Sequence, residues 1–332
     1  MKNADNTVHV HVVHSMKGGC GKSAFSLFKA ITLARDANVN ESLESRVLYI
    51  DADFKGTSLQ YLLCDSFMEQ IKKGSSLSKE VIESRATGLC GNGGENQLAF
   101  SESYKSVYLN DYLKGDYEHR FCDLFMESIV YQDHPGSAEK DVNGRIDFVF
   151  SSPEMKEKNI FRNRDERLGE GRFANNIASF LKTALRKGRG RGDQISGQYT
   201  QIIIDMPPGH DSYSDLLLLE LKKLKRKYDN IKIYYYSVTT DDRGHLKSMK
   251  ENLADIEQYD EDKSIYNNVN AVLCCMGNND FKNYKEIVED LQAEKWWKPN
   301  RNLIFLVPYQ NEYREFCRNR DKMKFPCRIV TL

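Results

Sequence analysis

The chain has 332 residues, with 48 Lys and Arg against 48 Asp and Glu, 40% hydrophobic residues and 29% charged residues. This composition is typical of a folded globular protein and excludes a chain that is disordered throughout. No purely apolar run is longer than the six residues 271–276, which is far too short to span a membrane, and the first residues lack the apolar core of a secretory signal. We therefore expect a cytoplasmic protein whose 8 cysteines, none in a C-x-x-C pair, stay reduced.

Short apolar runs alternate with helical stretches along the chain. Seven runs rich in Val, Ile, Leu, Tyr and Phe are expected to be strands: residues 8–13, 47–50, 146–150, 201–204, 231–238, 270–275 and 303–307. Helical periodicity is clearest over residues 23–37, 173–187, 212–228, 243–259 and 281–295. This alternation predicts an α/β fold with a doubly wound, mainly parallel sheet of seven or eight strands and helices on both faces.

One segment departs from this alternation. Between the second and third runs, residues 74–103 (GSSLSKEVIESRATGLCGNGGENQLAFSES) are rich in Gly, Ser and Glu and show little periodicity. We expect residues 1–332 to form one domain, with residues 74–103 as an insertion or a mobile loop within it.

A glycine-rich motif follows the first run and precedes the first helical stretch. It reads Lys17-Gly18-Gly19-Cys20-Gly21-Lys22-Ser23, and a strand, a glycine-rich loop and a helix in this order form the context of a phosphate-binding loop. Glycines let backbone N–H groups converge on phosphate oxygens at a helix N-terminus, a lysine neutralises the phosphates and a serine hydroxyl ligates Mg²⁺. The motif therefore predicts that residues 17–24, from Lys17 to Ala24, bind a nucleotide.

The extra lysine at the start of the loop makes the motif resemble the deviant Walker A sequence K-G-G-x-G-K-S/T of the ParA/MinD ATPases, which are P-loop NTPases. Two further segments match this family in order: VLYIDAD, residues 47–53, resembles its strand ending in D-x-D, and IIIDMPPG, residues 202–209, resembles its Walker B segment. The resemblance implies a P-loop NTPase fold, ATP and Mg²⁺ as ligands, ATP hydrolysis, and an ATP-dependent homodimer in which Lys17 reaches the partner's phosphates.

The chemistry of phosphoryl transfer to water needs a metal ion, charge neutralisation and a positioned water molecule. We assign charge neutralisation to Lys17 and Lys22. Asp51, Asp53 and Asp205 end neighbouring strands, where open α/β sheets place their ligands. We expect Ser23, Asp51 and Asp205 to serve the metal ion and Asp53 to position the water, although strand alternation leaves the roles of Asp51 and Asp53 interchangeable.

Two departures from the family pattern affect the expected site. Ala24 replaces a threonine that contacts the α-phosphate, and Phe54-Lys55 replaces a Pro-Gln pair after D-x-D, so we expect slow hydrolysis without a partner. The segment 276–280 lacks N-K-x-D, which favours ATP over GTP. The resemblance places the adenine pocket at Pro308 and Tyr309, and a proline that simply ends a strand is the equally weighted alternative.

Basic clusters at residues 182–191, 222–227 and 318–328 could bind DNA non-specifically or could complement helix C-termini. The C-terminal residues 324–332 are interrupted by a proline and do not predict a membrane anchor. The leading hypothesis is a ParA-like ATPase that positions a cargo such as plasmid or chromosomal DNA with the help of a protein activator or adaptor. The alternative is an ATP-dependent regulatory or assembly switch that acts on a protein partner without DNA.

Overall fold

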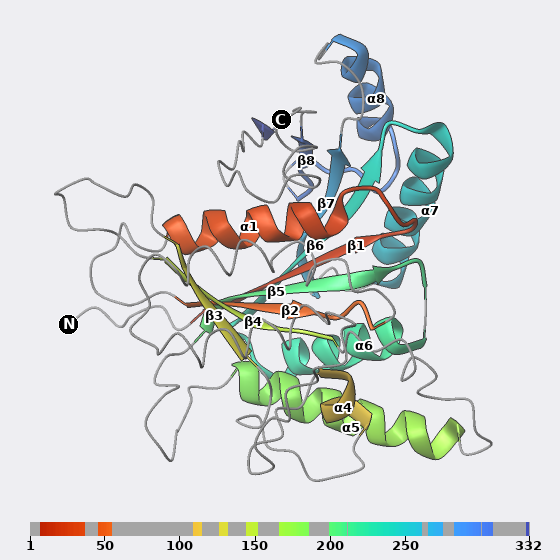
Figure 1. The fold of residues 1–332 in the computed structure, drawn as a ribbon. Helices are drawn as coiled ribbons and strands as arrows, with labels where there is room; N and C mark the ends of the chain where they lie inside the picture. The colour runs from red at the N-terminus through yellow and green to blue at the C-terminus, as the bar shows by residue number, and fades with distance from the viewer. Residues whose placement is uncertain are drawn as a thin grey trace, which may run out of the picture.

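A nine-stranded sheet with helices on both sides dominates the structure (Figure 1). The structure is a computed structural model that describes residues 7–36, 46–54, 109–114, 126–131, 144–151, 166–185, 199–210, 212–260, 265–274, 282–299, 301–307 and 330–331. The strands are β1 (Val8–Ser15), β2 (Arg46–Asp51), β3 (Met126–Tyr131), β4 (Gly144–Val149), β5 (Tyr199–Pro208), β6 (Ile231–Thr240), β7 (Tyr266–Cys274), β8 (Ile304–Val307) and β9 (Val330–Thr331). The helices are α1 (Lys22–Asp36), α4 (Leu109–Lys114), α5 (Glu166–Leu185), α6 (Ser212–Lys227), α7 (Arg243–Tyr259) and α8 (Lys282–Gln292).

The strand order is β3-β4-β2-β5-β1-β6-β7-β8-β9. All seven apolar runs found in the sequence are strands, and these seven pair in parallel from β4 to β8. The remaining two, β3 and β9, pair antiparallel at the two edges. The doubly wound, mainly parallel α/β sheet is thus confirmed, but it has nine strands and not the expected seven or eight, because β3 and β9 extend the seven parallel strands at the two edges.

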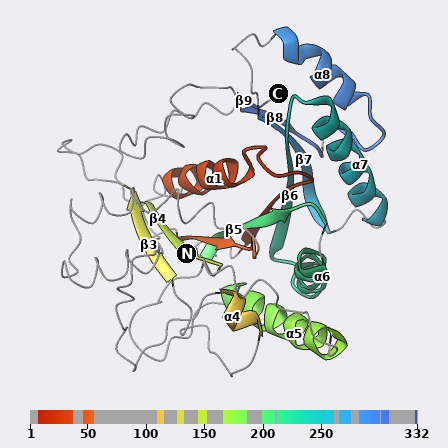
Figure 2. The same cartoon turned by 45° about the vertical axis from the view of Figure 1, so that its right-hand side comes forward.

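Each face of the sheet carries its own hydrophobic cluster. On one face, α1 contributes Phe25, Ala30 and Ile31 to a cluster with the odd-numbered side chains of β2. On the other face, α4, α5, α6, α7 and α8 pack on Val10, Val12 and their neighbours in the sheet. Figures 1 and 2 show α1 on one side of the sheet and α4, α5 and α6 on the other. Strands covered on both faces need apolar residues at odd and even positions, which explains the continuous apolar runs of the sequence.

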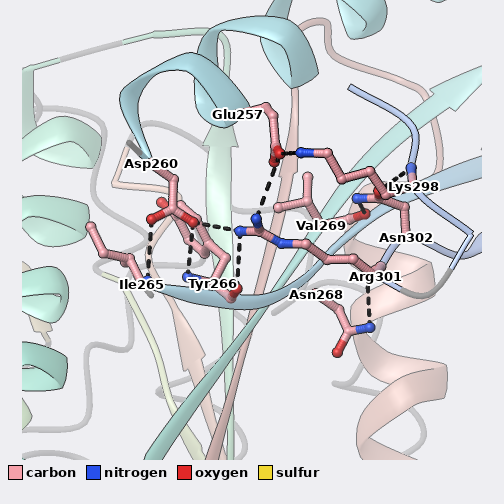
Figure 3. Close-up of polar contacts among 9 residues, drawn as sticks. All are labelled: Glu257, Asp260, Ile265, Tyr266, Asn268, Val269, Lys298, Arg301 and Asn302. Carbon is pink, nitrogen blue, oxygen red and sulfur yellow. Dashed lines mark hydrogen bonds and ion pairs between the residues drawn. The ribbon is translucent and has the colours of Figure 1, made fainter. Parts of the chain in front are cut away.

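A cluster of charged residues lies at the amino-terminal end of β7, an inner strand of the sheet (Figure 3). The carboxylate of Asp260, which caps the C-terminus of α7, accepts the backbone N–H groups of Ile265 and Tyr266. Arg301 Nη2 donates to Asp260 Oδ2 at 2.6 Å, and Lys298 and Arg301 both pair with Glu257. This cluster ties α7 to β7 and to the segment before β8, at the opposite end of the strands from Asp51 and Asp205.

Several predicted features lie outside the described residues. These are the insertion at residues 74–103, the expected adenine-site residues Pro308 and Tyr309, and the basic segments 186–191 and 318–328. Within the described ranges, none of the helices combines the length and the apolar character that crossing a lipid bilayer requires.

Candidate functional site

The glycine-rich loop joins the end of β1 to the start of α1, as the motif predicts. Gly19 and Gly21 have φ values of 77° and 84°, in the left-handed region that glycine adopts without strain. The loop passes directly into the helix, since Phe25 N donates to Gly21 O at 2.9 Å. The side chain of Cys20 is buried in the cluster beneath α1, which leaves the backbone of the loop to face a ligand. The geometry is that of an anion-binding turn at a helix N-terminus.

Lys22 and Asp205 form a buried ion pair at the centre of the site. Lys22 Nζ lies 2.6 Å from Asp205 Oδ1, and the two side chains are 7% and 1% exposed. Lys22 Nζ also donates to the Ser23 hydroxyl at 3.2 Å. Burial alone lowers the pKa of the Lys22 amine, but the charge and hydrogen bond of Asp205 outweigh it and the net shift is upward. The ammonium group is therefore fully charged at neutral pH, as phosphate neutralisation requires.

Two more donors hold the carboxylate of Asp205. The Ser26 hydroxyl, one turn beyond Lys22 on α1, lies 3.2 Å from Oδ1 and 3.0 Å from the Lys22 backbone oxygen, and its single proton is shared between these two acceptors. The Tyr49 hydroxyl donates to Oδ2 at 3.0 Å, from β2. Burial, followed by the charges of Asp205 and Asp51, raises the pKa of Tyr49 well above its ordinary value, so its hydroxyl remains a proton donor.

Asp51 and Asp205 lie side by side at the carboxyl ends of two adjacent strands. They are direct partners in the parallel register of β2 and β5. Asp51 Oδ1 accepts the backbone N–H of Asp53 at 3.1 Å, and its backbone O accepts the Ser151 hydroxyl at 2.6 Å. Burial raises the pKa of Asp51 well above its usual value, and the charges of Asp205 and Asp53 add to this shift. The carboxyl groups of the site thus carry more negative charge than the ammonium group of Lys22 alone can neutralise.

The segment after Asp205 is held against the end of β1. Gly209 has a φ of 77°, its N donates to Ser15 O at 2.7 Å, and its O lies 2.7 Å from Nε2 of His14. His14 Nδ1 is in turn 2.7 Å from the Tyr235 hydroxyl on β6. Because a carbonyl oxygen only accepts, His14 Nε2 carries a proton and donates it to Gly209. These contacts fix the backbone that follows Asp205.

Lys17 is exposed and its ammonium group lies beside the first turn of α7. A Cβ added at Gly244 would be 3.3 Å from Lys17 Nζ and 3.2 Å from Asp242 Oδ1. Asp242 caps α7 by accepting His245 N at 3.0 Å. This bond is the largest cause of the lowered pKa of Asp242, to which Lys17 makes a smaller contribution. The two lysines of the loop thus have different surroundings, Lys22 in the core of the site and Lys17 at its surface.

The oxygen donors of the site fit a magnesium ion that shares its coordination with a nucleotide. Within the ranges that the structure describes, no three His, Cys, Asp or Glu side chains are arranged to hold a metal ion by themselves. Mg²⁺ is commonly bound through one or two carboxylates together with phosphates and water. Ser23, Asp51 and Asp205 would supply the protein oxygens. A divalent cation would offset the neighbouring carboxylate charges that, after burial, raise the pKa of Asp51.

One of the basic clusters lies largely on α6. Lys223 pairs with Glu220 at 2.6 Å, and the ammonium groups of Lys222 and Lys227 lie over the rings of Tyr266 and Tyr228. Burial lowers the pKa of Lys222. Three of the lysines in this cluster therefore have partners within the chain, in addition to complementing the C-terminus of α6.

The sequence interpretation missed Ser26 and Tyr49. Both could have been found from spacing: Ser26 is four residues after Lys22 and shares its helix face, and Tyr49 is two residues before Asp51 and shares its strand face. The structure places Lys22, Ser23, Asp51 and Asp205 close together, with Asp53 hydrogen-bonded to Asp51 through its backbone.

No protein-family model matches the sequence, and a search of curated proteins also found no match. A search of solved structures found a similar chain described as "Structure of pnob8 ParA". The TM-score is 0.46 and the sequence identity 16%, over 87% of this chain and 73% of that chain. The site described above rests on the residues of this chain and not on that likeness.

Proposed function

We propose that the chain is a ParA-like ATPase that binds ATP with Mg²⁺ and hydrolyses it slowly. The observation that carries this proposal is the buried Lys22–Asp205 pair at a glycine-rich turn between β1 and α1. Lys22 would neutralise the phosphates, the loop backbone would bind them, and Ser23, Asp51 and Asp205 would hold Mg²⁺, which polarises the transferred phosphoryl group. Asp53, beside the metal residues, would position the attacking water.

The finer part of the proposal is a switch cycle. An ATP-bound dimer, in which Lys17 contacts the partner's nucleotide, would alternate with an ADP-bound monomer and thereby position a cargo such as plasmid or chromosomal DNA. The exposure of Lys17 supports this role, because a lysine with its ammonium group at the surface can contact a second copy. A protein activator or cargo adaptor would set the timing of hydrolysis.

The experiment is a light-scattering measurement of molar mass for Asp53→Ala with Mg·ATP and with Mg·ADP, together with ATP binding and phosphate release by the wild type. We expect wild-type binding and slow turnover, and a mass that doubles only with ATP when hydrolysis is blocked. Lys17→Ala in the same background is the control and should stay monomeric. A wild type that binds no ATP contradicts the enzymatic proposal, and equal mass in both nucleotides contradicts the cycle.

A second candidate is an assembly or regulatory switch that acts on a protein partner without DNA. The internal partners of Lys222, Lys223 and Lys227 favour it, because Glu220 offsets the charge of Lys223 and the two tyrosine rings hold the ammonium groups of Lys222 and Lys227 against the protein. Retention on duplex DNA at rising salt separates the two candidates. ATP-dependent retention that falls steeply with salt supports the cargo function with DNA, whereas retention absent at low salt supports the protein switch.

A further inference from the structure

Asp205 is held by three donors that come from two different elements. Lys22 and Ser26 of α1 reach Oδ1, and Tyr49 of β2 reaches Oδ2. Ser26, Tyr49 and Asp205 are all 0% exposed. The carboxylate is therefore fixed from both sides by buried groups, and rotation of its plane would break at least one of these hydrogen bonds.

The three donors differ in what they do under the proposed function. Lys22 is the group that a bound nucleotide would share, so its bond to Asp205 is the one that changes when phosphates arrive. The two hydroxyls contact no expected ligand and are neutral, so they orient Asp205 without adding a positive charge that would compete with Mg²⁺. A carboxylate that keeps one hydroxyl on each oxygen keeps its plane when the lysine moves.

The same sheet contains a second buried Tyr–Asp hydrogen bond that serves as a reference. Tyr199, at the start of β5, donates to Asp147 Oδ2 at 2.8 Å, and both residues are buried. Asp147 pairs with Leu48 in the strand register, whereas Asp51 pairs with Asp205. The Tyr199–Asp147 bond therefore lies away from the carboxyl ends of the strands. It provides a comparison with a buried tyrosine–aspartate hydrogen bond that lies away from the site.

We infer that Tyr49 and Ser26 are positioning residues for the magnesium site, whose hydroxyls hold the two oxygens of Asp205 in the orientation that the hydrated ion requires. The inference rests on the proposed function. Its consequence is specific: losing either hydroxyl impairs the Mg²⁺-dependent part of nucleotide binding and leaves the Mg²⁺-independent part, made by the loop backbone and Lys22, unchanged.

The test compares Tyr49→Phe, Ser26→Ala and Tyr199→Phe with the wild type, by the fluorescence of a labelled ATP analogue titrated in EDTA and at increasing Mg²⁺. For Tyr49→Phe we expect the Mg²⁺ concentration for half-maximal binding to rise about tenfold, the factor for one hydrogen bond to a charged group. Ser26→Ala should raise it about threefold, because the contact is longer at 3.2 Å, the hydroxyl proton is shared with Lys22 O, and Oδ1 keeps Lys22. Tyr199→Phe should match the wild type, and affinity in EDTA should be the same for all four proteins.

The results that overturn the inference are distinct from those that overturn the proposed function. An unchanged Mg²⁺ requirement in Tyr49→Phe and Ser26→Ala overturns the inference alone, as does an equal shift in Tyr199→Phe. Thermal melts identify any loss of affinity that follows from unfolding, and a loss equal in EDTA and in Mg²⁺ also overturns the positioning role. A wild type that binds no analogue with or without Mg²⁺ overturns the proposed function itself.

Discussion

Breaking the Lys22–Asp205 pair tests whether the site residues also hold the fold. Lys22→Met removes the ammonium group and leaves a carboxylate that is 1% exposed and lies beside Asp51. Breaking a buried pair by removing one partner costs about 3–5 kcal/mol, because the remaining charge is buried without compensation. Asp205 keeps its bonds to Ser26 and Tyr49, so we expect the lower end, about 3 kcal/mol.

The double variant Lys22→Met/Asp205→Asn separates stability from binding. Without the carboxylate there is no uncompensated charge, and the asparagine amide still contacts the two hydroxyls. We expect the double variant to recover most of the loss and to unfold within about 1 kcal/mol of the wild type. Nucleotide binding should be absent from both variants, because neither has the phosphate-neutralising lysine.

The assay is urea unfolding in EDTA without nucleotide, followed by far-ultraviolet circular dichroism and by tryptophan fluorescence, whose coincidence tests for a two-state transition. Arg301→Met is the matched control, because it breaks the ion pair with the buried carboxylate of Asp260 at the opposite end of the strands from Asp205 (Figure 3). It should lower stability and leave nucleotide binding intact. A Lys22→Met protein as stable as the wild type, or a double variant less stable than Lys22→Met, would refute the reasoning.

Three further predictions concern stability and the loop. Burial lowers the pKa of His11 to about 3, so as pH falls below 6.5 this histidine is protonated in the unfolded chain before it is protonated in the native state. The free energy of unfolding in urea should therefore fall by about 2–3 kcal/mol by pH 4.5. His11→Gln should lack this loss, whereas the control His210→Gln, at an exposed site, should retain it. Because the pKa of Asp51 is raised in the fold, the native state holds more protons above pH 3.8 and stability falls as pH rises. Asp51→Asn should therefore raise the melting temperature at pH 7.5 while weakening Mg²⁺-dependent nucleotide binding, and a lower melting temperature would contradict the sign. Gly21→Ala should lower the free energy of unfolding by about 1–2 kcal/mol, because the φ of Gly21 is 84°, and it should weaken ATP binding. The control Gly171→Ala, inside α5 with open space around the new methyl group, should raise the free energy of unfolding by up to about 1 kcal/mol.

The elements that the sequence predicted well share one property, a strong local pattern. The seven parallel strands are continuous apolar runs, and α7 spans Arg243–Tyr259, the range its periodicity predicted, because Asp242 and Asp260 cap it at both ends. The edge strand β9 has two residues, too few for any pattern to register. The phosphate loop was predictable because its chemistry is local: glycines, a lysine and a serine within seven residues determine it.

The contacts that the sequence did not reveal are those between distant segments. Tyr49 and Ser26 meet at Asp205 only because β2 lies beside β5 and α1 packs across both, and strand order is not written in any one segment. The contacts of His9 and His11 also join segments that are distant in the chain. They stack on Tyr234 of β6, a neighbour more than two hundred residues away in the chain, and thereby become part of the sheet's packing.

The charge distribution of the site links stability to ligand binding. Asp51, Asp53 and Asp205 share one buried ammonium group. Burial is the largest cause of the raised pKa of Asp51, and repulsion by the charges of Asp205 and Asp53 adds to it. A ligand that brings a divalent cation relieves that repulsion, and a ligand that binds only the native state stabilises it by about 2.7 kcal/mol at a hundred times its Kd. Part of the binding free energy of Mg·ATP would thus be repulsion released in the protein. Asp51→Asn starts without that repulsion. Mg·ATP should therefore raise its free energy of unfolding by less than that of the wild type, even when each protein receives ATP at the same multiple of its own Kd measured without Mg²⁺.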